Sequence, residues 1–583
     1  MITHYIISFF LFFLILINSS HAGNSLASNT NRLKVGITSP LNKVFKTKPF
    51  NFKGQNSNKA EIQLALNEYE ATQIVLFPEA SYTDISINIG PLIHENKTDT
   101  IAPDSVQINP IGYIRLKGGT KTQGRTGFHP DILLPNQYLN LKAGIPQPLL
   151  VTVYAPPDTT PGRYHSVLTI KNKNGLNQQV TLNVMVHNIL IPKQPRFKSL
   201  SLARNRNYSK LWPEDQGYKK LSIQEERAVF RKIADIGFRN YLPPTGFMVN
   251  GLVSSNRNGK SETYVSHPTH DVKTGKFDSS TTDKYIDYLL SKGANSFFIG
   301  ITSDIYKYEE NSNQREETLL KYLDDLIPHL KKRGILDQSY LYNIDEPWGR
   351  AVEHAKKIYR LVKQRYGYDI HIIQNTNQNN DQILGDILNH FQAIDINLGF
   401  YKATKLQDYR EKYPGIFHDV WWNLNLWPRT RPNLFLEYPL IDARIIGPMS
   451  FKFDIQGFEY WELTYIGKIK NYRPVKNDDF QLDWSIDDNS LDGFLLYPND
   501  NYDFYSSMRF ESFRDGMEDQ ELLYLLQQLD PDNALLDVSI VNDINDCSES
   551  IEQYMNFRNK LLTEINNYSS PSTSKYTFSI ERP

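Results

Sequence analysis

A repeating order of helix, glycine and strand-like run constrains the fold of this chain more than any other feature. From Ser199 onward, short apolar runs alternate with amphipathic stretches that are typical of helices. Gly237, Gly293, Gly334 and Gly367 each stand where such a stretch ends, just before the next run. Because strands that alternate with helices form parallel sheets, this part of the chain is predicted to be an α/β fold.

The strand-like runs number eight, which is the number of strands in a (β/α)8 barrel. The sequence Ser222-Ile-Gln-Glu225 is a capping box that opens the first intervening helix, and Gly237 is expected to close that helix. We therefore predict a TIM-like barrel over residues 196–530. The expected strands are residues 199–203, 239–242, 296–301, 340–345, 370–374, 394–398, 418–422 and 457–461.

The chain before the barrel follows a different pattern. Residues 33–191 contain short β-branched runs, several of them alternating, with Pro, Gly and Asn between them. Asn172-Lys-Asn-Gly175 is typical of a hairpin turn. We predict an all-β sandwich here, joined to the barrel by residues 192–195. An accessory or packing role is favoured for it, with carbohydrate binding as the alternative.

The two ends of the chain carry their own signals. Residues 5–17 are almost wholly apolar, and Ser20-His-Ala22 supplies the small residues of a cleavage site. Residues 1–22 are thus predicted to be a signal peptide, which implies a secreted or periplasmic protein of bacterial type. An uncleaved N-terminal anchor is the alternative, and no later stretch predicts a membrane span. Residues 531–583 are expected to form a helical C-terminal tail.

Composition and motifs exclude several functions. The chain has 64 Lys and Arg against 65 Asp and Glu, so no basic field favours nucleic acid. The single cysteine excludes an intrachain disulfide. A phosphate-binding loop, a dinucleotide fingerprint and an HExxH helix are all absent from the sequence. We therefore expect neither a cofactor nor a metal.

Residues 341–348, Leu-Tyr-Asn-Ile-Asp-Glu-Pro-Trp, contain the strongest candidates for catalysis. An apolar run ends in Asp345 and Glu346, and Pro347 stops the predicted fourth strand. Parallel barrels build their active sites at the carboxyl ends of strands. Neighbouring side chains on a regular strand point to opposite faces, but a tip broken by proline relaxes that rule. Both acids are therefore predicted to share one pocket; in the alternative they cap the next helix and pair with Arg350.

Aromatic side chains gather at two further strand ends, where they suit the apolar faces of sugar rings. The predicted strand seven ends in a Trp-Trp pair, and strand eight ends in Tyr-Trp. In the alternative, these rings fill the barrel. The charged helical stretch over residues 509–526 is better explained by a buried network of ion pairs than by catalysis. The candidate substrate contacts are Tyr342, Asn343, Trp421, Trp422, Tyr460, Trp461 and Arg509.

The chain resembles glycoside hydrolase family 123, the β-N-acetylgalactosaminidases, over roughly residues 33–530. The upstream sandwich fits that family's layout as well. The matching segments are Pro161-Gly-Arg-Tyr164, Asp345-Glu346-Pro347, Trp421-Trp422, Asn433-Leu-Phe, Pro439-Leu-Ile-Asp-Ala-Arg444, Gly457-Phe-Glu-Tyr-Trp461, Gly493-Phe-Leu-Leu-Tyr-Pro498 and Arg509-Phe-Glu-Ser-Phe-Arg-Asp-Gly516.

The resemblance implies substrate-assisted hydrolysis of a glycan or glycolipid with retention of configuration. Asp345 would orient the 2-acetamido group, whose oxygen attacks the anomeric carbon to form an oxazoline-type intermediate. Glu346 would protonate the leaving oxygen and then activate water. Retaining enzymes that use a protein nucleophile hold two carboxyl groups about 5 Å apart across the bond. Two sequence neighbours, whose Cα atoms are about 3.8 Å apart, suit a substrate that brings its own nucleophile.

Two other functions stay open from the sequence. A glycosidase of another specificity would use a second acid, Glu459 or Glu462, at strand eight. Loss of activity on substrates without the acetamido group would argue against it. A non-catalytic surface protein would bind glycans through the sandwich and an inert barrel, although the intact Asp345–Glu346 pair counts against that reading.

Overall fold

The structure is a computed structural model. It describes residues 33–46, 52–117, 126–201, 208–248, 277–300, 312–342, 346–347, 349–367, 370–376, 393–397, 403–412, 419–426, 429–467, 469–486 and 491–568. The predicted signal peptide, residues 1–22, lies outside these ranges. No helix in the described part of the chain is long and apolar enough to cross a membrane.

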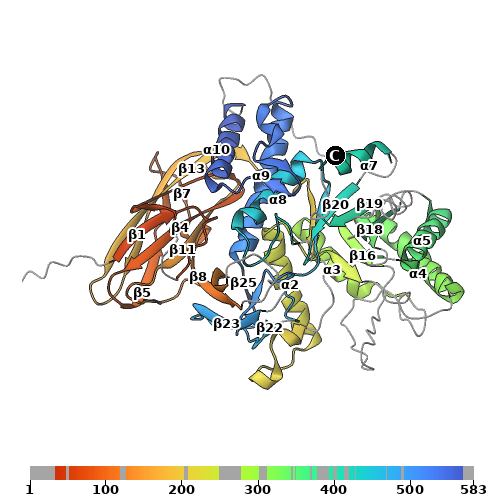
Figure 1. The fold of residues 1–583 in the computed structure, drawn as a ribbon, viewed down its shortest axis with the longest axis horizontal. Helices are drawn as coiled ribbons and strands as arrows, with labels where there is room; N and C mark the ends of the chain where they lie inside the picture. The colour runs from red at the N-terminus through yellow and green to blue at the C-terminus, as the bar shows by residue number, and fades with distance from the viewer. Residues whose placement is uncertain are drawn as a thin grey trace, which may run out of the picture.

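An N-terminal β region, built mainly from strands β1 to β13, forms one side of the molecule in two facing sheets (Figure 1). The first sheet has the order β2-β1-β4-β11-β8-β23-β22, with β9 also paired to β8. Its strands are β1 (Leu33–Thr38), β2 (Gln55–Asn56), β4 (Glu68–Pro78), β8 (Val106–Leu116), β9 (Gly127–Leu133), β11 (Gln147–Ala155), β22 (Ile469–Lys470) and β23 (Gln481–Ile486).

The second sheet has the order β10-β5-β12-β13-β3, with β6 and β7 at its side. Alternate residues of β12, such as Leu168 and Ile170, are buried in the core between the sheets, as a half-buried strand requires. The predicted turn at Asn172–Gly175 joins β12 to β13, which confirms the hairpin. The strands are β3 (Lys59–Leu66), β5 (Tyr82–Ile89), β6 (Leu92–His94), β7 (Thr100–Ile101), β10 (Leu139–Leu141), β12 (Gly162–Lys171) and β13 (Asn177–Leu190).

The N-terminal β region also contains a distant part of the chain. Strand β23 pairs in parallel with β8, so residues 469–486 extend the first sheet although they follow the last parallel strand. Trp484 and Leu482 of this segment are buried with Ile114 and Ile132 in a separate apolar cluster. Residues 192–195 thus mark a change of pattern along the sequence. They do not separate the two regions completely, because residues 469–486 return to the N-terminal β region.

The second region is a mixed α/β fold around an eight-stranded parallel sheet in the order β14-β21-β20-β19-β18-β17-β16-β15. Seven of the eight predicted strands coincide with observed ones. The second differs, because residues 239–242 lie at a helix end and its following turn, whereas β15 begins at Gly246. The strands are β14 (Lys198–Ser201), β15 (Gly246–Met248), β16 (Phe297–Gly300), β17 (Ser339–Tyr342), β18 (His371–Thr376), β19 (Ala393–Asn397), β20 (Asp419–Leu424) and β21 (Gly457–Tyr460).

The role of Gly237 explains that difference. The predicted capping box at Ser222 is present, but helix α2 (Ile223–Arg239) continues past Gly237 to a cap at Asn240. A Cβ atom on Gly237 would stand 2.8 Å from the carbonyl oxygen of Leu242. This glycine therefore allows the chain to pack closely as it leaves the helix, and the strand begins later than predicted.

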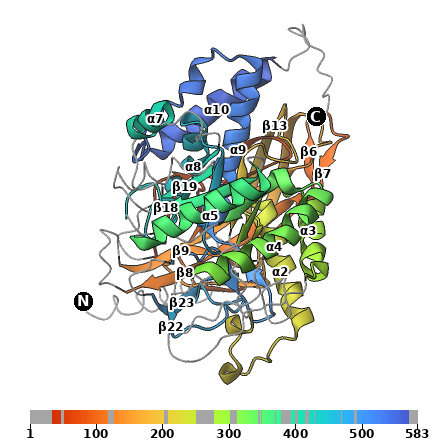
Figure 2. The same ribbon diagram turned by 90° about the vertical axis from the view of Figure 1, so that its right-hand side faces the viewer.

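Further helices cover the outer face of the parallel sheet or lie beside the N-terminal β region. Figure 2 shows α3, α4 and α5 side by side on that face, and Figure 1 shows α8 and α9 between the two regions. Gly293 and Gly367 cap α3 and α5, as predicted. The helices are α3 (Ser280–Lys292), α4 (Ser312–Lys332), α5 (Arg350–Tyr366), α7 (Ala403–Lys412), α8 (Leu440–Lys452), α9 (Met508–Leu529) and α10 (Ile551–Tyr568). Two short hairpins are β24 (Tyr497–Pro498) with β25 (Phe504–Tyr505), and β26 (Val541–Asp543) with β27 (Asp546–Cys547).

Helices α8 and α9 cross at a pair of glycines. A Cβ atom on Gly447 would stand 2.0 Å from the carbonyl oxygen of Gly516, and one on Gly516 would stand 2.0 Å from that of Arg444. Both contacts are with backbone, which cannot rotate aside as a side chain can. The two helices therefore approach as closely as they do because neither residue has a side chain.

A buried network of charges joins these helices to the N-terminal β region. The Arg444 guanidinium on α8 binds Asp519 of α9 and Glu70 of β4, each at 2.8 Å. Arg558 on α10 binds Asp519 at 2.9 Å and also pairs with Glu68. All five residues are buried. The charged stretch over residues 509–526 is thus a buried ion-pair network, as the sequence favoured.

Candidate active site

One face of the parallel sheet carries a layer of apolar and aromatic side chains. Because successive residues of a strand point to opposite faces, residues two apart share this layer. Phe298 packs against Trp421 with ring centres 4.9 Å apart and stacks on Tyr342 at 5.7 Å. The layer consists of Leu200, Phe298, Tyr340, Tyr342, Ile373 and Trp421, all of them buried.

Polar side chains follow this layer toward the carboxyl ends of the strands. Asn375, Asn423 and Glu459 each come two residues after Ile373, Trp421 and Gly457 respectively, so they share the same face. All three are buried, and Asn423 is the direct neighbour of Glu459 in the sheet. Two amides and a carboxyl group therefore lie just beyond the apolar layer, at the edge where parallel α/β folds build their sites.

Glu346 lies beside Asn375 in a strained conformation. Its backbone N–H donates a 2.8 Å hydrogen bond to Asn375 Oδ1 on β18. Its carboxylate Oε1 accepts a long 3.5 Å hydrogen bond from Asn425 Nδ2, just after β20. The φ angle of Glu346 is 41°, which a side chain other than glycine rarely adopts. Such strain persists only where neighbouring groups hold it, and here Asn375 on β18 and Asn425 just after β20 do so.

The other members of the predicted catalytic segment divide into two groups. Asp345 and Asn343 lie outside the described residues. Tyr342 belongs to the buried layer beneath the polar edge, where only 7% of its surface is exposed. The structure thus places Glu346 at the edge of the sheet with a side chain that is only partly buried.

The two adjacent tryptophans of β20 point in opposite directions. Trp421 faces the layer of aromatic side chains, where Gly457 makes room for its indole ring. Trp422 faces the helices, and its Nε1–H donates a 3.1 Å hydrogen bond to Ser450 Oγ of α8. Both side chains are fully buried. Strand alternation therefore gives Trp422 a packing position behind the sheet and removes it from the predicted substrate contacts, while Trp421 supports the floor of the site.

Tyr460 and Trp461, at the end of β21, both donate hydrogen bonds to the buried carboxyl group of Asp492. Tyr460 is buried, and its hydroxyl donates to Asp492 Oδ1 at 3.3 Å and accepts from the Gly493 N–H at 2.8 Å. Trp461 is partly exposed, and its Nε1–H donates to Asp492 Oδ2 at 3.0 Å. Burial raises the pKa of Asp492 to about 7. Tyr460 thus has a structural position, whereas Trp461 keeps an exposed face that can contact a sugar.

The Arg509 guanidinium is bound by other groups of the protein. It is buried and pairs with Asp131 of β9 at 2.9 Å. Its remaining N–H groups donate to the carbonyl oxygens of Leu434 and Phe494, both at 2.6 Å. These contacts tie α9 to the N-terminal β region, so the geometry assigns Arg509 a structural role in place of the predicted substrate contact.

The two alternative acids of strand eight have different surroundings. Glu462 Oε1 accepts hydrogen bonds from the backbone N–H groups of Leu463 at 3.0 Å and Thr464 at 3.3 Å, so it holds a turn. Glu459 instead lies on the same face of the sheet as Asn423. If a second acid took part in a reaction, Glu459 would be the better placed of the two.

Sequence reasoning missed the asparagines Asn375, Asn423 and Asn425 and the buried Asp492. A signal for the first three was present, since each stands at the end of a predicted parallel strand. Asp492 had none, because it comes from a loop that returns to strand eight only in three dimensions. In the described part of the chain, no group of three His, Cys, Asp or Glu side chains could hold a metal ion.

These features define a class of protein. The carboxylate at a strand tip, the buried amides around it and the partly exposed tryptophan nearby are suited to bind a sugar and transfer a proton to it.

Residues 299–526 match the sequence model of the family described as glycoside hydrolase 123, catalytic domain. This match agrees with the geometry of the site, and the protein is a glycoside hydrolase. The match includes Glu346 and the strands β17 to β21. Among curated proteins, none matches the chain.

Solved structures resemble this chain to different degrees, and the first one described here has the same fold. A family 123 glycoside hydrolase from Clostridium perfringens, analysed for glycolipid glycan hydrolysis, is 14% identical; the match covers 93% of this chain and 99% of that chain with a TM-score of 0.70. A family 39 glycoside hydrolase from Bacteroides cellulosilyticus WH2 is 12% identical, with coverages of 78% and 81% and a TM-score of 0.32. A GH5 xyloglucanase from Bacteroides ovatus is 9% identical, with coverages of 79% and 98% and a TM-score of 0.29.

The contrast between Trp422 and Trp461 leads to a prediction. Trp422→Ala is expected to lower the unfolding free energy by about 3–5 kcal/mol, the usual cost of truncating a buried tryptophan, and to leave KM of the folded enzyme unchanged. Trp461→Ala should raise KM for an aryl glycoside with a smaller loss of stability. Thermal unfolding and steady-state kinetics measure both effects. A larger KM increase for Trp422→Ala than for Trp461→Ala would contradict these assignments.

Proposed function

We propose that this enzyme removes β-linked N-acetylgalactosamine, or a related N-acetylhexosamine, from a glycan or glycolipid by substrate-assisted retention. The observation that carries the proposal is the bond between the Glu346 N–H and Asn375, which holds a carboxylate at the carboxyl edge of the parallel sheet. The resemblance of the Asp345-Glu346-Pro347 tip to family 123 supports the choice of sugar. The related Clostridium enzyme, analysed for glycolipid glycan hydrolysis, supports the choice of substrate class.

In the first step, the 2-acetamido oxygen attacks the anomeric carbon while the bond to the leaving oxygen breaks. Glu346 gives its proton to that oxygen, and Asp345 steadies the positive charge that develops on the acetamido nitrogen. In the second step, Glu346 takes a proton from water, and the water oxygen opens the oxazoline-type ring. Two inversions at the same carbon give net retention. The Glu346 carboxyl must therefore be protonated before the first step and ionised before the second.

The same proposal includes a closed (β/α)8 barrel. The parallel sheet has the order of such a barrel, in which β14 and β15 would be the last neighbours to meet. The N–H of Ser201 on β14 donates a 2.8 Å hydrogen bond to the Pro243 carbonyl, shortly before β15, which supports closure there. Export of the protein remains a proposal from the apolar run at residues 5–17.

A panel of aryl β-glycosides tests the mechanism. We expect hydrolysis of the N-acetylgalactosaminide. The N-acetylglucosaminide should also be hydrolysed if the site accepts a sugar whose 4-hydroxyl has the opposite configuration. The β-galactoside should be inert, because it lacks the acetamido nucleophile. NMR of the first product formed should show the β-anomer.

The second candidate function is a glycosidase that uses a protein nucleophile. It is favoured by Glu459, a buried acid on the same face as Asn423 at the edge of the sheet. Rapid cleavage of the β-galactoside, with loss of that activity in Glu459→Gln, would establish it and overturn substrate assistance.

A further inference from the structure

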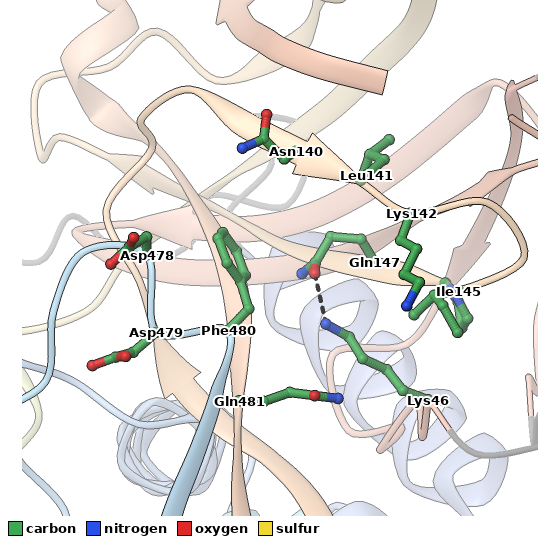
Figure 3. A pocket seen from close by; sticks show the side chains of 11 residues that line it. Lys46, Asn140, Leu141, Lys142, Ile145, Gln147, Asp478, Asp479, Phe480 and Gln481 are labelled. Carbon is green, nitrogen blue, oxygen red and sulfur yellow. Dashed lines mark hydrogen bonds between the residues drawn. The ribbon is translucent and has the colours of Figure 1, made fainter. Parts of the chain in front are cut away.

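A polar pocket lies in the N-terminal β region, away from the parallel strands. Its volume is about 370 Å³, within the usual range of small-ligand sites. One wall comes from β10 and the loop that follows it; the other comes from residues 478–481, which lead into β23 (Figure 3). Figure 1 places β23 beside β8 and well apart from β16 to β20. The pocket is therefore separate from the candidate active site.

Lys46 provides the positive charge of this pocket. Its Nζ donates a 2.9 Å hydrogen bond to Gln147 Oε1 and stands 4.4 Å from the centre of the Tyr113 ring. The Gln147 amide nitrogen donates to the carbonyl oxygens of Ile111 and Pro148, which fixes its oxygen toward the lysine. Burial lowers the pKa of Lys46 to about 8.

No carboxylate in the described part of the chain forms an ion pair with Lys46. A partly buried ammonium that is bound only by neutral acceptors is unfavourable, and an anionic ligand offsets that cost. The Lys46 ammonium therefore favours binding of an anion, which the described protein groups do not supply.

The remaining lining groups suggest what carries the anion. In Figure 3 the Lys142 side chain extends toward Gln147 and Lys46, whereas Asp478 and Asp479 lie on the opposite side, near Phe480. Arg473 binds the Asp479 carboxylate at 2.7 Å and so neutralises it. Lys46 Nζ lies 5.8 Å from the centre of the Phe480 ring, so the positive charge and the aromatic face are neighbours, and the Asp478 carboxylate lies farther along the pocket.

We propose that this pocket binds an acidic sugar residue, with its carboxylate or sulfate against Lys46 and Lys142 and its ring against Phe480. Aromatic faces pack on sugar rings, while the amide of Asn140 and the carboxylate of Asp478 suit sugar hydroxyls. Such a site would hold the glycan to the enzyme away from the bond that is cleaved. It does not depend on the proposed catalytic mechanism.

Calorimetric titration of the full chain with D-glucuronate, D-galactose 6-sulfate, D-galactose and inorganic sulfate tests this proposal. At least one acidic sugar should bind, and galactose should bind about tenfold more weakly or not at all. Whether the carboxylate or the sulfate is preferred identifies the anion. Lys46→Gln, which keeps a hydrogen-bonding group but loses the charge, should weaken the acidic sugar by about tenfold or more. Lys34→Gln, in an exposed ion pair with Glu79, is the matched control.

Three results would overturn the site: equal binding of galactose, unchanged binding by a folded Lys46→Gln, or inorganic sulfate binding as tightly as the sulfated sugar. Phe480→Ala should weaken the sugar while any binding of inorganic sulfate is kept. Hydrolysis of a small aryl glycoside should be unchanged in every variant. Failure here is therefore distinguishable from failure of the proposed catalytic function.

Discussion

Glu346→Gln is expected to lower kcat for substrates with poor leaving groups by about 10²–10⁴, the usual contribution of general acid–base catalysis. The glutamine keeps the size of the side chain and the backbone bond to Asn375 but has no proton to give. Aryl glycosides with good leaving groups need less protonation, so their first step should lose less. Kinetics on a series of aryl leaving groups measures the difference as a steeper dependence of rate on leaving-group pKa.

Asp345→Asn is the matched comparison. It also removes one carboxylate, but the loss of charge should impair attack by the acetamido oxygen whatever the leaving group. Azide, which replaces activated water, should rescue Glu346→Gln better than Asp345→Asn. A thiazoline analogue of the cyclic intermediate should inhibit the wild type and bind Asp345→Asn poorly. A reversed leaving-group dependence between the two variants would show that the roles are exchanged, and a covalent sugar–protein adduct would exclude substrate assistance.

The second large effect is expected at Asp519, where loss of charge should cost about 3–5 kcal/mol of unfolding free energy. Asp519 binds Arg444 at 2.8 Å, Arg558 at 2.9 Å and the Tyr554 hydroxyl at 2.7 Å. Asp519→Asn keeps the shape but leaves two buried guanidinium groups with less negative charge. Because these groups join α8, α9 and α10 to β4, the loss should appear in the main unfolding transition. Urea unfolding followed by circular dichroism measures it.

An exposed ion pair provides the control for this experiment. Asp324 binds Arg365 at 2.5 Å, with side chains 39% and 49% exposed. Asp324→Asn removes the same charge at the surface, where ion pairs contribute only about 0–1 kcal/mol. Equal stability of Asp519→Asn and Asp324→Asn would mean that the buried network does not stabilise the fold.

Local patterns in the sequence were sufficient for most of the secondary structure. The capping box at Ser222 and the glycines after α3, α4 and α5 act within a few residues of themselves, so they have the same effect in any fold. The alternation of strand-like runs with helices likewise predicted the parallel strands. Gly237 is the exception. It allows close packing against Leu242, and the sequence alone does not distinguish such a glycine from one that ends a helix.

The sequence pointed to a candidate site at the strand tips, but it could not show which side chains there are buried in packing contacts. Glu346 was predicted because a carboxylate at a strand tip is a local signal, and Trp461 because it ends the last predicted strand. Trp422 and Arg509 were predicted as substrate contacts on the basis of residue type. Their buried partners, Ser450 and Asp131, lie far away in the sequence, which no local pattern could reveal.

The sequence by itself thus determined the elements, their parallel order and the strand tip that carries the acid, since these depend on period and on neighbours in the chain. Only the tertiary structure decided which face each side chain occupies relative to distant groups. It alone brought Asn375 and Asn425 to Glu346, returned residues 469–486 to the N-terminal β region and gathered Arg444, Asp519 and Arg558 into one buried network. The physical reason is that hydrogen bonds and desolvated ion pairs act over a few ångströms in space, whatever the separation along the chain.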